Sequence, residues 1–313
     1  MSALDKSMLG KITLGKIMDV LRDPPPEFVF EVSADGIAMS RTRPPAAIQH
    51  AALKAGVIVP SPVKENILDP AAFAEAVRRL TPPATGRGKR GAAVILPDNC
   101  VRIAVLDFDN VPEKEEELRP LINFRLRKSV PFDVDGAAIS WFVQAGKKIV
   151  VALTPSEIVS HYETAFRVAG LQPGFITVSS LAALDLLPVT GSLVLARRSP
   201  GALTVLAVAN GVVTIARTLE IGDPEALDVD PQEEIIAALY PTLAYIEDQS
   251  GARPEKLFIA GFGDDADEAC IRLAIELEIP VEPLAEAHPG LAGYLASIAP
   301  AAIAPKNVKQ AAA

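Results

Sequence analysis

The sequence predicts an α/β protein of two halves, with a small α+β module inserted in the first half. Each half opens with a predicted hairpin, because Asp35-Gly36 and Asn210-Gly211 each separate two apolar runs. Asp-Gly and Asn-Gly favour the positive-φ positions of tight hairpin turns. Between these hairpins, about residues 97–170 show strand, helix, two strands and helix in order. A chain of 313 residues is long enough for this arrangement.

Composition narrows the function classes. Half of the residues are apolar, the formal net charge is −9, and no long basic stripe is present. Nucleic-acid binding is therefore not expected, because neutralising phosphates needs clustered Lys and Arg. No apolar run reaches the ~18 residues of a membrane span. The two cysteines, Cys100 and Cys270, stand in apolar contexts and are expected to be core residues.

The first half is predicted to cover residues 28–186. Residues 1–27 precede it as an arm that mixes Lys with apolar residues, either poorly ordered or a helix for a membrane surface or a partner. A hairpin is expected after the break "DPPPE". The stretch "DPAAFAEAVRRL" predicts a helix, with Asp69 as N-cap and Pro70 in its first turn.

The module is predicted from a distinct local pattern. "VRIAVLDF" is a strand, and the helix of "PEKEEELRPLINFRLRKSV" is acidic at its start and basic at its end, which suits the helix dipole. "GAAISWFVQ" and "KKIVVALT" form a strand pair. Thr154 and Glu157 have the spacing of a capping box for the next helix.

The second half is predicted to cover residues 187–304, followed by a frayed tail at 305–313. It begins with three strands in "GSLVLARRSPGALTVLAVANGVVTIARTLEIG", continues with a helix bent near Pro241, and ends with "KLFIAGFG", a helix and a short strand. No catalytic constellation stands out. The three histidines, His50, His161 and His288, are far apart and adjoin no recognisable nucleophile.

One stretch carries a family resemblance. "AAVILPDNCVRIAVLDFDNVPEKEEELRPLINFRLRKSVPFDVDGAAISWFVQ" combines a strand ending in Leu-Pro, a basic and apolar strand, a Pro-acidic helix, and Val130-Pro131-Phe132 before an acidic turn. This series, with "AGLQPGFITVSSLAAL" after it, resembles the PilM family of type IV pilus assembly, over about residues 28–300. The resemblance implies an actin-like (ribonuclease H-like) fold, shared with FtsA and the cytoplasmic part of GspL.

The resemblance also implies two phosphate loops, which in PilM-like proteins typically read Asp-Ile-Gly. The acid orients magnesium, and the Gly lets backbone N–H groups approach the phosphates. Here the first loop reads Glu31-Val32-Ser33, which retains a carboxylate but lacks the Gly.

The second loop departs further. Leu195 stands where the acid belongs and Arg197 where the Gly belongs, followed by Arg198. Leu195 offers magnesium no oxygen, so we expect no metal site, no catalytic residue and no magnesium-dependent ATP hydrolysis. Both arginines are expected to be solvated turn residues, although two arginines also suit a phosphate without metal, so ATP binding without turnover stays open.

The adenosine-side turn, usually a run of glycines in this family, reads Gly261-Phe262-Gly263. This turn would still leave room for the adenine base, although Phe262 is expected to crowd that space.

The expected function is a cytoplasmic scaffold at the inner face of the inner membrane. In the PilM family, the N-terminal tail of PilN, a single-span membrane protein, docks between the inserted module and its host. We therefore expect a PilN-like tail and other pilus platform proteins as partners, with the chain peripheral to the membrane. An unpaired strand edge of the module would accept the tail, with one wall at Arg125, Arg127 and Phe132.

Two alternatives remain. An active nucleotide-binding ATPase of the same superfamily would need an acid and a Gly at the second loop. A GspL-like platform of type II secretion would be distinguished by a membrane-spanning extension.

Overall fold

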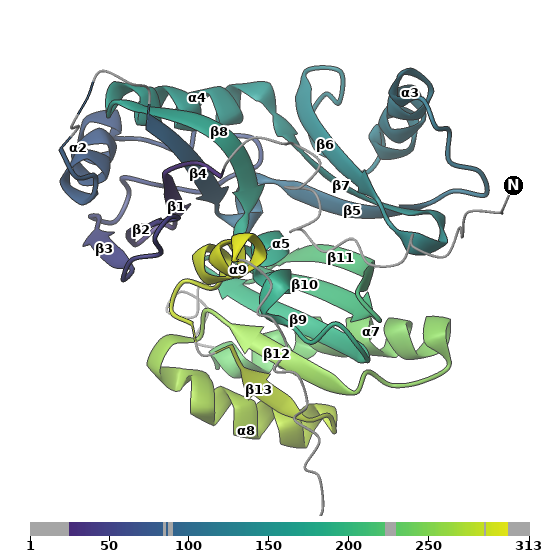
Figure 1. Cartoon of the computed structure of the whole chain (residues 1–313). Coiled ribbons are helices and arrows are strands. Elements are labelled where there is room, and N and C mark those ends of the chain that lie inside the picture. Colours follow the sequence, from purple (N-terminus) through teal and green to yellow (C-terminus); the bar gives the residue numbers. More distant parts are fainter. Residues whose placement is uncertain (1–24, 84–85, 87–89, 223–229, 285, 300–313) are drawn as a thin grey trace, which may run out of the picture.

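The computed structural model describes residues 25–83, 86, 90–222, 230–284 and 286–299 (Figure 1). Most of the predicted N-terminal arm and the predicted tail at 305–313 lie outside the described residues. Two five-stranded sheets form the two halves, and a three-stranded sheet forms a separate module beside the first (Figure 1). This arrangement confirms the predicted fold class.

The first sheet has the strand order β3-β2-β1-β4-β8. Its strands are β1 (Phe28–Val32), β2 (Gly36–Arg41), β3 (Gln49–Ala52), β4 (Arg90–Leu96) and β8 (Leu171–Val178). Strands β1, β2 and β3 pair antiparallel, whereas β4 lies parallel to both β1 and β8.

Alternation along β1 separates two apolar layers on this sheet. Phe28 and Phe30 face α2 (Pro70–Leu80) and α4 (Ser156–Val168), whereas Val29 faces α5 (Ser179–Ala183) and α9 (Pro289–Ile298). Glu31 follows the parity of Val29, so it points toward α5 and α9. Helix α9 is near the C-terminal end but packs on the first-half sheet, although the sequence assigns it to the second half.

The second sheet has the order β11-β10-β9-β12-β13. Its strands are β9 (Ser192–Ser199), β10 (Ala202–Ala209), β11 (Val212–Glu220), β12 (Lys256–Ala260) and β13 (Val281–Pro283). Helices α7 (Pro231–Ser250) and α8 (Ala266–Leu277) pack on one face, while Leu195 and Leu206 on the other face join the apolar cluster of the first half.

The module sheet has the order β5-β7-β6 and is antiparallel throughout. It comprises β5 (Arg102–Asp107), β6 (Ala137–Val143) and β7 (Lys148–Pro155), with helix α3 (Glu115–Leu126) packed on one face. Its strand β5 lies beside β11, so the module contacts the second half as well as its host (Figure 1).

Of the two predicted helix caps, that of α2 is confirmed and that of α4 is wrong. Asp69 accepts a hydrogen bond from the Ala72 N–H at 2.9 Å, which confirms the predicted N-cap of α2. The capping box is wrong: β7 extends to Pro155, and the Thr154 hydroxyl donates instead to the Cys100 carbonyl at 2.7 Å. A buried acceptor from the short helix η1 (Asp98–Cys100) has displaced the local partner.

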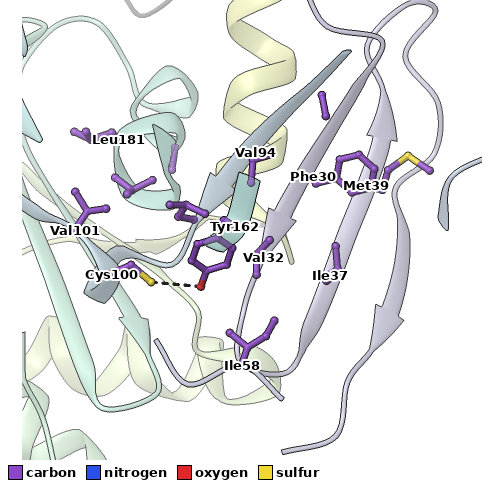
Figure 2. Close-up of a cluster of buried hydrophobic side chains, with 14 of the residues drawn as sticks. Phe30, Val32, Ile37, Met39, Ile58, Val94, Cys100, Val101, Tyr162 and Leu181 are labelled. Carbon is purple, nitrogen blue, oxygen red and sulfur yellow. Dashed lines mark hydrogen bonds between the residues drawn. The ribbon is translucent and has the colours of Figure 1, made fainter. Parts of the chain in front are cut away.

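Both cysteines are free and buried, as predicted. Figure 2 shows Tyr162 of α4 pointing toward Cys100 in the first-half core, with its hydroxyl 3.6 Å from the sulfur. Within the described residues, no helix combines the length and the apolar character that crossing a bilayer requires.

Candidate functional site

A cleft of about 800 Å³ separates the two halves. The β1–β2 turn (residues 33–35) lines it from the first half, and the β9–β10 turn (residues 199–201) lines it from the second. The predicted Asn210-Gly211 turn forms, with both residues at positive φ, but it is not at this cleft. It adjoins the module instead, because the strand that leads into the cleft is β9 and not β10.

Arg197 is the central charged group of the cleft. Its guanidinium lies 3.3 Å from the Asp98 carboxylate and 3.5 Å from that of Glu31. Arg197 comes from the second half and both acids come from the first, so this ion-pair cluster spans the two halves. All three are buried, with Arg197 8%, Glu31 3% and Asp98 0% exposed.

Backbone groups at two helix starts hold the carboxylates in place. The Leu291 N–H at the start of α9 donates to Glu31 at 2.8 Å, and the Ser179 hydroxyl donates to the same carboxylate. The Ser180 N–H donates to Asp98 at 2.8 Å. Buried carboxylates need such partners, and helix N-termini favour negative charge.

The second loop therefore differs from its sequence interpretation. Arg197 is not a solvated turn residue but a buried strand residue, because the two carboxylates of the opposite half compensate its charge. Leu195 is fully buried in the core and supplies no oxygen to the cleft. Among the described residues, no group of three or more His, Cys, Asp or Glu is arranged to hold a metal ion.

The other predicted loop residues divide between cleft and core. Ser33, Arg198 and Gly261 line the cleft. Gly261 has φ +80°, and a Cβ there would overlap the Arg198 carbonyl, so this position requires glycine. Phe262 does not crowd the cleft, because its side chain is buried in the second-half core. Gly263 begins the short helix η4 (Gly263–Asp265) and is not among the lining residues.

The cleft also contains a histidine pair that sequence reasoning missed. His50 and His288 stack with ring centroids 5.4 Å apart, 238 positions apart in the chain. Burial lowers the pKa of His288, and His50 and Arg197 lower it further, while Glu31 acts in the opposite direction. No sequence signal identifies this pair, since His50 lies in β3 and His288 comes just before α9, far along the chain.

A second site lies between the module and the first half. It is an apolar groove of about 270 Å³, whose walls include β6 residues 138–142 and β8 residues 175–178. Within the described residues, β6 pairs only with β7 and β8 pairs only with β4. The groove therefore lies between the unpaired edges of two sheets.

Strand register defines which face of the module forms the groove. Val150, Ala152 and Thr154 of β7 stand on the groove face, together with their β6 partners such as Phe142. The intervening residues, such as Ile149 and Val151, pack with α3 in a separate cluster. Helix α3 therefore covers the opposite face of the module sheet.

Consequently, the structure places the three predicted partner-binding residues away from the groove. Arg125 lies over the ring of Phe108, Arg127 forms an exposed ion pair with Asp135 at 2.8 Å, and Phe132 packs in the α3 cluster. None of the three lines the groove. The sequence predicts an unpaired strand edge in the module. The end of α3 that carries Arg125, however, lies on the face of the module sheet opposite to the groove.

The comparisons with known proteins support the fold. No protein-family model and no curated protein sequence matches this chain. A solved structure described as the PilM-PilN type IV pilus biogenesis complex matches with a TM-score of 0.70 and 16% identity, over 88% of this chain and 100% of that chain.

Two further solved structures match less closely. A Bacteroides thetaiotaomicron protein with an actin-like ATPase fold has a TM-score of 0.54 and 11% identity, over 86% of this chain and 94% of that one. The cytoplasmic domain of EpsL, an inner membrane component of the type II secretion system of Vibrio cholerae, has a TM-score of 0.51 and 10% identity, over 85% and 93%. At these identities the likeness shows the fold, which is actin-like as predicted.

Proposed function

We propose that this chain is a PilM-like scaffold that binds the N-terminal cytoplasmic tail of a PilN-like, single-span inner-membrane protein. The observation that carries the proposal is the apolar groove between the free edges of β6 and β8. The likeness to a structure of the PilM-PilN complex supports it. In this proposal the chain works at the cytoplasmic face of the inner membrane, among other pilus platform proteins.

The groove has the properties that capture of an extended peptide requires. Phe142 and Ile176 are partly exposed and line it, so apolar side chains of a bound tail would be removed from water there. The neighbouring strand edges offer main-chain N–H and C=O groups to an added strand. Main-chain hydrogen bonds give such a peptide affinity, and side-chain pockets give it specificity.

The proposed scaffold works without ATP hydrolysis. The acid of the first loop, Glu31, is paired with Arg197, and the second loop has Leu195 in place of an acid. Magnesium needs oxygen ligands. Binding of a nucleotide in the remaining cleft without turnover is compatible with this scaffold role.

The test is a titration of the full chain with a labelled peptide of the cytoplasmic tail of a candidate single-span pilus protein from the same organism. Ala152→Phe fills the groove floor, and Thr177→Arg places a charge on the β8 wall. We expect each variant to weaken binding at least about tenfold, which is roughly 1.4 kcal/mol. Thermal melts establish that each variant is folded.

The matched control is the double variant Arg125→Glu, Arg127→Glu on the opposite face of the module. We expect its affinity to equal that of the wild-type chain. If only this double variant loses affinity for the tail peptide, the tail binds at α3 and not in the groove. No binding of the wild-type chain to any single-span protein of its machine would remove the scaffold proposal.

A second candidate function is a platform subunit of type II secretion, favoured by the likeness to the EpsL cytoplasmic domain. The same titration separates the two, because the chain should prefer the tail from its own machine. Preference for a type II secretion tail over the pilus tail would support this second candidate.

A further inference from the structure

We infer that Arg197 is a built-in substitute for a divalent cation, which clasps the two halves across the cleft without metal or nucleotide. The clasp consists of Arg197, Glu31 and Asp98. It concerns the cleft alone and does not depend on which partner the groove binds.

The carboxylate oxygens are divided between the two halves. Glu31 Oε2 accepts from the Leu291 N–H, and Asp98 Oδ1 accepts from the Ser180 N–H, both within the first half. The remaining oxygens, Glu31 Oε1 and Asp98 Oδ2, are the ones that contact the guanidinium. Each acid is thus anchored by one oxygen to a backbone N–H and presents the other to Arg197 of the opposite half, and Glu31 Oε1 also accepts from the Ser179 hydroxyl.

This geometry suits a cation. Two anchored carboxylates that face the same group present hard oxygen ligands, the type that Mg²⁺ and Mn²⁺ favour. In this chain that group is the Arg197 guanidinium, whose planar fork carries a permanent charge and reaches the two acids with different nitrogens. The protein itself therefore supplies the positive charge that balances the two carboxylates.

Burial makes the counter-charge necessary. Asp98 is fully buried and Glu31 nearly so, and removing one partner of a buried ion pair leaves an uncompensated charge. Without Arg197, two carboxylates would face each other in a medium of low dielectric, where like charges repel strongly. A bound divalent cation would relieve that repulsion, so the variant should acquire a metal dependence that the wild-type chain lacks.

Arg198 provides a matched control. It is adjacent in sequence and lines the same cleft, but within the described residues it forms no ion pair; its guanidinium instead lies 6.0 Å from the centroid of the Phe262 ring. Replacing Arg198 removes the same charge from the same cleft and leaves the clasp intact.

The experiment compares melting temperatures of the full chain in EDTA and in Mn²⁺, together with Mn²⁺ binding by calorimetry. For the wild-type chain and Arg198→Ala, we expect the same melting temperature in both solutions. Arg197→Ala should melt at a lower temperature in EDTA, recover in Mn²⁺, and bind Mn²⁺ at least about tenfold more tightly than wild type. Adding Glu31→Gln to Arg197→Ala should abolish both the recovery and the binding.

Arg197→Lys is the second variant. It keeps a charge but is a point charge without a fork, so it should melt between wild type and Arg197→Ala and gain no Mn²⁺ binding. If Arg197→Ala can be purified as a folded protein only in the presence of Mn²⁺, that result would also support the clasp. An Arg197→Ala chain that is unaffected by Mn²⁺, or a wild-type chain that Mn²⁺ stabilises equally, would overturn the inference.

Discussion

The side-chain amide of Gln144 pairs with both backbone groups of Val213. Its Nε2 donates to the Val213 carbonyl at 2.9 Å, and its Oε1 accepts from the Val213 N–H at 2.8 Å. Gln144 follows β6 of the module and Val213 belongs to β11 of the second half, so one side chain joins the two parts as an added strand would. The module is therefore held at the second half as well as at its host.

Replacing Gln144 with Leu should lower the free energy of unfolding by about 2–4 kcal/mol, because two buried hydrogen bonds are lost and two backbone groups remain unpaired. Urea denaturation measures the change, and hydrogen exchange at Val213 should accelerate. Gln49→Leu, at an exposed position of β3, is the control and should change stability by no more than about 0.5 kcal/mol. Equal effects of the two variants would contradict the structural role of Gln144.

Asp185 lies near the contact between Gln144 and Val213 and should make the free energy of unfolding depend on pH. Burial raises the pKa of Asp185 from 3.8 to about 7, and its Oδ2 has no hydrogen-bond partner among the described residues. Because the folded pKa is the higher one, the stabilising contribution of this proton is complete below about pH 4 and is lost as pH rises through about 7.

Asp185→Asn should remove that dependence. At pH 8 the variant should be more stable than the wild-type chain, by on the order of 2 kcal/mol. Denaturant melts of both proteins across pH 5 to 8 measure the difference between them, so other titrating groups cancel. A difference that stays constant over this range would show that Asp185 titrates normally.

Cys100 should be unreactive in the folded chain. Burial raises its pKa from 9.0 to about 12, and Asp98 adds to the shift. Since the thiolate is the reactive form, alkylation of Cys100 at pH 8 should be at least about 100-fold slower than in the urea-unfolded chain. Mass spectrometry after timed iodoacetamide exposure gives both rates. Equal rates in the folded and unfolded chain would contradict the buried position.

Gly293 should be intolerant of a methyl group. Gly→Ala inside a helix ordinarily stabilises by about 1 kcal/mol. In α9, however, a Cβ at position 293 would overlap the Ala182 carbonyl of α5, so backbone would have to move. We expect Gly293→Ala to lower the free energy of unfolding by at least about 2 kcal/mol. Ala296→Ser, exposed on the same helix, is the control and should be nearly neutral.

Much of the fold could be predicted from the sequence, because hairpin dipeptides, helix caps and apolar periodicity act over a few residues. Asp69 caps α2 through the N–H three residues later, and Asn210-Gly211 turns the chain where it stands. The sequence alone likewise shows that position 195 carries a leucine and not an acid. The Thr154 capping box failed because a distant carbonyl competed for the hydroxyl.

The candidate sites depended on tertiary structure, because they join residues whose separation in the chain carries no signal. Arg197 lies 166 positions after Glu31 and 99 after Asp98, and only the packing of the two halves makes it a buried counter-ion instead of a solvated turn residue. The stacking of His50 on His288 likewise needs tertiary structure, because α9 returns from late in the chain to pack on the first-half sheet. The module's free edge was expected, but strand order and side-chain alternation decided that it is β6, facing β8 and turned away from α3.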